Sequence, residues 1–206
     1  GNLSDMTPRA LEALRDADII ACEDSRRSLP LLRHFDLAGA KLVPYHEHNE
    51  KEQSARLVEE LEAGKSVALI SDAGTPGIND PGADLVNAAH ERGIPVSPLP
   101  GASAPVCLLS VSGLSWDRYT YLGFLPRKEG ELRRDVAAWR PGVMVFLEAP
   151  HRIETCLRVL GEEQPEAMLV LGRELTKRFE SIARIQAREA IAWLQADPAR
   201  LKGEYT

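Results

Sequence analysis

The sequence predicts an α/β protein with two lobes, in which the first sheet is mostly parallel and the second is mixed. In the first half, short β-branched or apolar runs alternate with helical patterns, which is typical of a parallel sheet with helices on both faces. In the second half fewer crossover helices separate the expected strands, which favours a mixed sheet. Ser112-Gly113-Leu114-Ser115 predicts a hinge, so the expected domains are residues 1–113 and 114–206.

The first lobe is expected to begin with a helix that runs to Asp16, with Thr7 as its cap and Pro8 at its first position. Gly64 is expected to end a later helix. Asp80 is expected to cap the helix at 83–92, with Pro81 at its first position. The remaining expected elements are strands at 18–22, 41–44, 66–70 and 94–97, and helices at 25–35, 50–63 and 83–92.

The second lobe is expected to contain as many strands as the first but fewer helices. Its expected strands cover 119–124, 142–148, 167–171 and 178–185, and its expected helices cover 129–139, 151–160 and 187–195. Both ends of the chain are expected to be truncated. Residues 1–3 indicate a turn without the strand that would precede it, and residues 203–206 indicate the start of a strand.

The composition favours a soluble globular protein. No apolar run approaches the roughly 18 residues that a membrane helix needs, and Asp5 and Pro8 interrupt any signal peptide. Cys22, Cys107 and Cys156 each lie in an apolar run without chelating or disulfide spacing, so we expect buried, reduced thiols in a cytosolic protein. The net charge of −6 argues against a protein that coats nucleic acid generally, although local basic patches are compatible with it.

The loop at residues 71–82, Ser-Asp-Ala-Gly-Thr-Pro-Gly-Ile-Asn-Asp-Pro-Gly, is the first candidate site. It connects an expected buried strand to an expected helix, which is where open α/β sheets bind ligands. Its three glycines permit close backbone approach to a ligand. It has neither a Walker lysine nor a G-x-G-x-x-G pattern, so a phosphate cradle or a dinucleotide site is not supported. The alternative is that its glycines and prolines serve loop geometry alone.

Polar residues follow two other strands of the first lobe. Glu23 and Asp24 stand beside an arginine pair, which suits a general base next to cations that bind a polyanion, or a helix cap with ion pairs. His46 and His48 point the same way in an extended segment, but a metal would need a third ligand. We therefore expect no metal there, and favour hydrogen bonding to a substrate or anchoring of the loop.

Three further junctions have similar features. Residues 99–104 open a helix of small residues whose backbone N–H groups could face a ligand, or which Ser103 merely caps. Residues 146–152 and 171–177 each end an apolar strand with a carboxylate beside a basic residue.

Taken in order, the motifs at residues 1–5, 21–27, 45–50, 71–76, 123–128, 150–152 and 173–177 resemble the bacterial ribosomal RNA small-subunit methyltransferase I family. The resemblance covers essentially the whole chain. It implies the two-lobed tetrapyrrole-methylase fold, with a cofactor cleft between the lobes. It also implies a cytoplasmic homodimer that transfers a methyl group from S-adenosylmethionine to the ribose 2′-hydroxyl of a cytidine in small-subunit ribosomal RNA.

The resemblance also implies site residues. The positions that match the family's cofactor contacts are Asp72, Thr75, Pro76, Ile78, Ser103, Ala104, Leu147, Glu148, Leu175, Gly203 and Glu204. A ribose hydroxyl needs a nearby base, for which Asp24, Glu23, His46 and Glu148 are the candidates. The expected RNA phosphate contacts are Arg26, Arg27, Arg127, Lys128 and Arg152. We expect the first four of these to lie on the same side as the loop at 72–78.

Two alternatives keep the fold and change the function. One is a methyltransferase that acts on a tetrapyrrole or another small molecule. The other is a non-catalytic module that binds a nucleotide or RNA. The basic pairs at 26–27 and 127–128 favour RNA over a small-molecule substrate.

Overall fold

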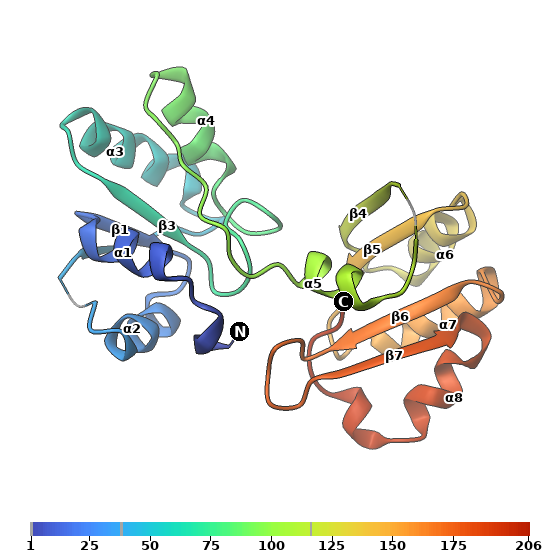
Figure 1. Cartoon of the computed structure of the whole chain (residues 1–206). Helices are drawn as coiled ribbons and strands as arrows, with labels where there is room; N and C mark the ends of the chain where they lie inside the picture. Colours follow the sequence, from blue (N-terminus) through green and yellow to red (C-terminus); the bar gives the residue numbers. More distant parts are fainter. Residues whose placement is uncertain (1, 38, 116) are drawn as a thin grey trace. The chain divides into compact units, whose positions relative to one another are not determined.

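The computed structural model describes residues 2–37, 39–115 and 117–206 (Figure 1). Gly1, the first residue of the motif at 1–5, lies outside the described residues. The contacts divide the chain into two compact units, Gly1–Ser103 and Ala104–Thr206, so that helix α5 (Ala104–Val111) is grouped with the second unit. The division at residues 113 and 114 stays a prediction.

The first unit contains a three-stranded parallel sheet in the order β2-β1-β3. Its strands are β1 (Ile19–Cys22), β2 (Lys41–Pro44) and β3 (Val67–Ile70). Cys22 is in register with both Pro44 and Ile70, so all three strands end at the same edge of the sheet. All four residues of the central strand β1 are buried, as expected for a strand covered on both faces. The predicted parallel sheet is confirmed.

Helices cover both faces of this sheet (Figure 1). They are α1 (Pro8–Asp16), α2 (Ser25–His34), α3 (Glu50–Glu62) and α4 (Ala83–Glu91), preceded by a short 3-10 helix at Leu3–Asp5. Successive residues of β1 point to opposite faces. Ile19 and Ala21 belong to one core cluster with Leu57 of α3 and Leu85 of α4. Ile20 belongs to another core cluster on the opposite face, with members from α1 and α2.

The predicted caps are partly right. The Thr7 side chain accepts a hydrogen bond from the Ala10 N–H and caps α1, as predicted. The cap predicted at Asp80, with Pro81 in the first turn, is wrong, because α4 begins at Ala83 with Gly82 in the cap position. The loop before α4 folds back on itself, and the Gly77 N–H donates to the Pro81 carbonyl oxygen at 3.2 Å.

The strand predicted at residues 94–97 is also wrong. Within the described chain these residues are irregular, although the Ile94 N–H still donates to the Ala89 carbonyl oxygen at the end of α4. Pro95 lies within this segment and Pro98 and Pro100 follow it closely, and proline has no N–H group to donate to a ladder. The alternating apolar residues Ile94 and Val96 therefore have the pattern of a strand, but the backbone does not form one.

The second unit combines parallel and antiparallel strand pairs. Strands β4 (Tyr119–Phe124) and β5 (Val143–Leu147) are parallel, and β6 (Met168–Arg173) and β7 (Ser181–Gln186) are antiparallel. Tyr205 forms isolated bridges with both Glu148 and Arg173, so the segment at 204–206 links the ends of β5 and β6. The other elements are α6 (Glu129–Ala137), α7 (Ile153–Glu163), α8 (Ala190–Gln195) and 3-10 helices at Ala187–Glu189 and Pro198–Leu201. The predicted mixture of strand directions is confirmed.

One core cluster fills the second unit, with members from α6, α7 and α8 and from the strands. Cys22 and Cys156 are buried free thiols, as predicted, but Cys107 is exposed and that part of the prediction is wrong. Helix α5 is apolar on every side but buries only Leu108. The neighbouring Val106 and Cys107 are therefore exposed although they are apolar. No helix in the described part of the chain is long and apolar enough to span a membrane.

Candidate functional site

Carboxylates from two strand ends meet at the carboxyl edge of the first sheet. Glu23 and Asp24 follow β1, and Asp72 follows β3. The Asp72 N–H donates to Glu23 Oε2 at 3.3 Å, and the Asp24 N–H donates to Asp72 Oδ1 at 3.3 Å. The parallel register of β1 and β3 therefore brings Asp72 next to Glu23 and Asp24, which lie 49 and 48 positions earlier in the sequence.

Two guanidinium groups lie beside these carboxylates. Arg26 Nη2 lies 2.8 Å from Asp24 Oδ2, and the Arg26 N–H donates to Asp24 Oδ1, so Asp24 caps α2. Arg27 Nε lies 3.4 Å from Asp72 Oδ2. Both arginine side chains are largely exposed. The first turn of α2 thus presents two positive charges at the same sheet edge as the loop that begins at Ser71.

The hydrogen bonds from Arg26 hold the pKa of the Asp24 carboxyl below its usual range. A carboxylate whose pKa is lowered is a weaker proton acceptor than an unperturbed one. Asp24 is therefore the less suitable of the base candidates, because its carboxylate caps α2 and pairs with Arg26.

Asp80 is a carboxylate that sequence analysis treated only as a helix cap. Burial raises its pKa, a hydrogen bond with Ser71 opposes the shift, and the negative charges of Glu23 and Asp72 add to it. The loop that returns from Gly77 to Pro81 carries Asp80 back toward the strand ends. The clue in the sequence is that the glycine- and proline-rich loop contains a second carboxylate besides Asp72, but the direction of the Asp80 side chain depends on how the loop folds.

The loop at 72–78 is held in a compact form. Thr75 Oγ1 donates to the Ala102 carbonyl oxygen at 3.0 Å, and the Ile78 N–H donates to the Thr75 carbonyl oxygen at 3.2 Å. Gly74 and Gly77 adopt positive φ angles of 78°, which glycine tolerates without strain. Ile78 is exposed, Pro76 is half-buried, and Ser103 directly follows the segment that the loop contacts. Of the cofactor positions implied by the resemblance, Asp72, Thr75 and Ser103 thus lie close together.

A hollow of about 260 Å³ lies next to the carboxylates. Its lining residues are Leu3, Arg27, Ser28, Pro30, Leu31, Ser71 and Asp72. The wall therefore combines aliphatic side chains with one cation and one carboxylate, which suits an organic molecule with polar groups.

His46 follows β2 and is half-buried. Its N–H donates to the Asn49 side-chain oxygen at 2.8 Å, while its own Nδ1 is buried without a hydrogen-bond partner among the described residues. The rings of His46 and His48 are 5.9 Å apart. In the residues that the structure describes, no three or more His, Cys, Asp or Glu side chains group closely enough to hold a metal ion.

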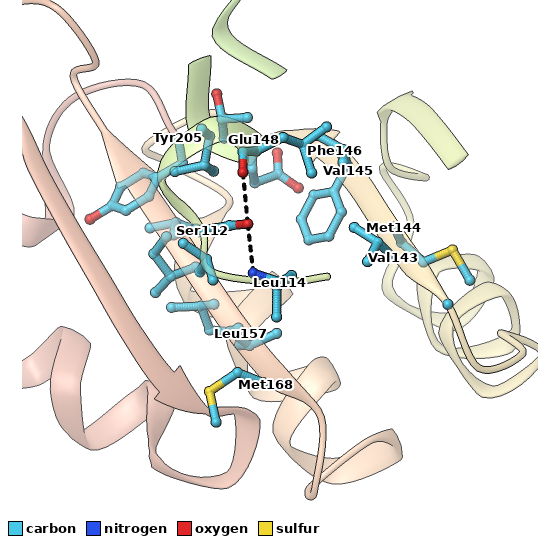
Figure 2. Close-up of a pocket in the computed structure, with 18 residues that line it drawn as sticks. Ser112, Leu114, Val143, Met144, Val145, Phe146, Glu148, Leu157, Met168 and Tyr205 are labelled. Atoms are coloured by element: carbon cyan, nitrogen blue, oxygen red, sulfur yellow. Dashed lines mark hydrogen bonds between the residues drawn. The ribbon is translucent and has the colours of Figure 1, made fainter. Parts of the chain in front are cut away.

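In the second unit, Glu148 directly follows β5 and is only 2% exposed. Its Oε1 accepts a hydrogen bond from the Ala149 N–H, and its Oε2 lies 3.2 Å from Arg152 Nη2 without hydrogen-bond geometry. Burial raises the pKa of this carboxyl group. Glu148, Ser112 and Tyr205 are among the few polar residues around a mostly aliphatic cavity of about 110 Å³ (Figure 2). Leu147, the last residue of β5, is half-buried.

Arg152, a predicted RNA contact, is engaged inside its own unit. Its Nη2 donates to the carbonyl oxygens of Leu125 and Pro126 at 2.9 and 2.8 Å, and its side chain is only 17% exposed. These bonds fix the segment that leads to Arg127 and Lys128, which are both exposed. Arg152 therefore orders a basic loop and has little surface of its own to offer.

The last three implied cofactor positions also lie together. Glu174 Oε1 accepts from the Glu204 N–H at 2.8 Å, and Lys177 Nζ reaches both Glu174 and Glu204. Gly203 has a φ of 92°, and a Cβ there would lie 2.5 Å from Glu174 Cγ. The Leu175 side chain packs against Gly172. Residues 203–204 are thus packed on the loop that follows β6.

Comparisons with known proteins were made on both sequence and structure. A family profile described as "Tetrapyrrole (Corrin/Porphyrin) Methylases" matches residues 1–191. A protein of Halalkalibacterium halodurans named "Ribosomal RNA small subunit methyltransferase I" is 42% identical, over 100% of this chain and 71% of its own length. The protein of the same name from Escherichia coli O157:H7 is 45% identical, over 99% of this chain and 72% of its own length.

Among solved structures, uroporphyrin-III-C-methyltransferase from Thermus thermophilus has the same fold. It aligns with a TM-score of 0.65 and 21% identity, over 100% of this chain and 88% of that one. A structure of the same enzyme complexed with S-adenyl homocysteine aligns with a TM-score of 0.59 and 19% identity, over 94% of this chain and 87% of that one. At these identities the likeness concerns the fold.

Proposed function

The chain belongs to the tetrapyrrole methylases and, within them, to the ribosomal RNA small subunit methyltransferase I family, and we propose that it transfers a methyl group from S-adenosylmethionine to small-subunit ribosomal RNA. The observation that carries this proposal is the identity of 42–45% with relatives of that name, over 99–100% of the chain. The proposal extends to the acceptor, the ribose 2′-hydroxyl of a cytidine, and to a cytoplasmic homodimer.

The first unit fits one end of this cofactor. The glycine-rich loop is exposed at Gly74 and Gly77, and the carboxylates of Glu23, Asp72 and Asp80 gather beside it. These negative charges favour a ligand that carries a sulfonium and an ammonium group. We propose that Asp72, Thr75, Pro76, Ile78 and Ser103 of the first unit contribute to the cofactor site. From the second unit we propose Ala104, Leu147, Glu148, Leu175, Gly203 and Glu204.

When bound, S-adenosylmethionine supplies a methyl group on a positively charged sulfur. In the transfer a C–O bond to the ribose oxygen forms as the C–S bond breaks, and the hydroxyl proton passes to a base. The protein's main task is to hold the two reactants in line, which can supply up to about 7–11 kcal/mol of the barrier. Because Arg26 forms an ion pair with Asp24 and lowers its pKa, we propose that the proton acceptor is Glu23, His46 or Glu148.

Exposed cations support an RNA substrate. Arg26 and Arg27 lie in the first turn of α2, and Arg127 and Lys128 directly precede α6. We propose that these four side chains contact phosphates, which positions RNA without reading its bases. Arg152 contributes by ordering the loop that carries Arg127 and Lys128.

The direct test is methyl transfer by the full chain to small ribosomal subunits that lack the modification, followed by mapping of the methylated nucleotide. We expect one 2′-O-methylated cytidine. Transfer to a uroporphyrinogen but not to subunits would favour the small-molecule alternative. Cofactor binding without any transfer would favour the non-catalytic module.

Thr75→Arg tests the loop. The larger, charged side chain replaces a hydroxyl that holds the Ala102 carbonyl, and should abolish S-adenosylmethionine binding measured by calorimetry. Thr75→Ser keeps the hydroxyl and should bind almost as tightly as the unmodified chain. Unchanged affinity in a folded Thr75→Arg variant would remove the loop from the site.

A further inference from the structure

Helix α4 starts at the end of the candidate cofactor loop without a cap of its own. Its cap position is Gly82, which has no side chain to accept the free N–H groups of the first turn. Instead, Glu50 Oε1 accepts hydrogen bonds from the Gly82 N–H at 2.8 Å and from the Asp84 N–H at 3.3 Å. Glu50 is the first residue of α3, so a side chain from another helix supplies the missing cap.

A buried tyrosine completes this arrangement. The Leu85 N–H donates to the Tyr45 hydroxyl at 3.2 Å, and that hydroxyl donates to Glu50 Oε1 at 3.1 Å. Ser54 Oγ lies 2.9 Å from the same hydroxyl. Because the only phenol proton goes to Glu50, the Ser54 hydroxyl is the donor in the Tyr45–Ser54 bond. Tyr45, Glu50 and Ser54 thus form a connected network with three backbone N–H groups of the first turn of α4.

The network is both enclosed and chemically stable. Tyr45 is fully buried and Ser54 is only 4% exposed. Burial raises the pKa of Tyr45 to about 12, so the phenol remains a hydrogen-bond donor at neutral pH. A buried network in which every donor has an acceptor fixes its members in one arrangement.

This network fixes one end of the loop at 71–82. The other end is held by Asp72, through its bonds to Glu23 and to the backbone of Asp24. At the end that Glu50 holds, Gly82 packs so closely on Gly77 that an added Cβ would lie 3.0 Å from the Gly77 nitrogen. A displacement of Gly82 is therefore transmitted to Gly77, in the part of the loop proposed to face the cofactor.

We propose that Glu50 is a positioning residue for the methyl transfer, and that its carboxylate holds the loop at 71–82 in the form that binds S-adenosylmethionine. This inference rests on the proposed function. Glu50 acts through Gly82 and touches neither reactant. Replacing Glu50 should therefore weaken cofactor binding by more than the accompanying loss of fold stability would cause.

The test compares Glu50→Gln and Glu50→Ala with two controls. Ser54→Ala removes a hydroxyl of the same network that hydrogen-bonds to Tyr45 and not to the backbone of α4, and Glu52→Gln changes an exposed carboxylate of α3 that pairs with Arg56. For each full-chain variant we would measure unfolding by urea, S-adenosylmethionine affinity by calorimetry, and hydrogen exchange of the amides at 77–85.

We expect both Glu50 variants to weaken cofactor binding, the alanine variant by about tenfold or more, because the loss of hydrogen bonds to a charged group has effects of that order. Exchange of the Gly82 and Asp84 amides should accelerate. In transfer assays KM for the cofactor should rise more than kcat falls. Ser54→Ala should lower stability yet change the affinity less than twofold. If Glu50→Ala does not fold, Glu50→Gln carries the test.

The outcomes separate this inference from the proposed function. Equal affinity in Glu50→Gln and the unmodified chain would overturn the positioning role and leave the methyltransferase proposal intact. An equal loss of affinity in Ser54→Ala and Glu50→Gln would show that general stability is responsible, and would also overturn it. If the unmodified chain does not bind S-adenosylmethionine, the cofactor proposal fails, and the positioning role fails with it.

Discussion

Gly82→Ala should be far more damaging than the matched substitution Gly64→Ala. Both glycines lie in the first unit and both have positive φ angles, 153° at Gly82 and 86° at Gly64. They differ in their surroundings. A Cβ at Gly64 would have nothing within 4 Å, whereas one at Gly82 would lie 3.0 Å from both the Gly77 nitrogen and Leu69 Cδ2.

The expected magnitudes follow from these surroundings. At Gly64 only the left-handed backbone conformation is penalised, at about 1–2 kcal/mol. At Gly82 the unfavourable backbone conformation costs about 1–3 kcal/mol, and the overpacking adds about 1–3 kcal/mol, for a total of about 2–6 kcal/mol. The Gly77 side of this contact is backbone, so it can move only if the loop moves.

Urea unfolding of the full chain measures both losses of stability. Because both glycines lie in the first unit, both losses affect the unfolding transition of that unit. Calorimetry with S-adenosylmethionine, below the onset of unfolding, should show weaker binding for Gly82→Ala and unchanged binding for Gly64→Ala. If the two variants lose equal stability and both bind the cofactor normally, the close contact between Gly82 and Gly77 does not shape the site, and the reasoning is refuted.

Three further predictions concern charge and assembly. Burial raises the pKa of Glu148, so the stability this group contributes is complete below the pKa of an unfolded glutamate, about 4.3, and is lost as the pH rises through the folded-state pKa. Glu148→Gln should therefore gain stability relative to the unmodified chain between pH 4 and pH 8 in urea unfolding, and a difference that does not vary with pH contradicts this. Replacing Arg26 and Arg27 by alanine should weaken subunit binding and reduce its salt slope by about 1 for each phosphate that the protein no longer neutralises, with little change in cofactor affinity. Arg56→Ala on α3, another exposed arginine, is the control, and equal salt slopes would remove the pair from the RNA interface. Light scattering at micromolar concentration should give twice the mass of one chain, and a monomer mass counts against the homodimer.

Much of the fold follows from local patterns in the sequence. The run Ile19–Cys22 is apolar at every position, which specifies a strand covered on both faces, and the structure buries all four residues. Thr7 and Pro8 specify the start of α1 through the chemistry of a helix cap. The place of the loop at 71–82, between a buried strand and a helix, likewise follows from composition and spacing. The order of the motifs identified the family, which the comparisons confirm.

Local patterns failed where the backbone or a distant partner decides the outcome. The residues at 94–97 have the apolar pattern of a strand, yet Pro95 within them and Pro98 directly after them lack the N–H donors that a ladder needs. Cys107 lies in an apolar helix, but which side of that helix is covered depends on the strands it packs against.

The sequence by itself determined most of the elements, the parallel direction of the strands in the first sheet and the place of the candidate loop between a strand and a helix. Only the tertiary structure decided that Glu50 and Tyr45 cap α4, that Asp80 joins Glu23 and Asp72, and that Arg152 is committed to the backbone after β4. Each of these contacts joins residues that are distant in the chain. Periodicity specifies which face of an element is buried, whereas strand register and loop closure determine which distant side chains meet.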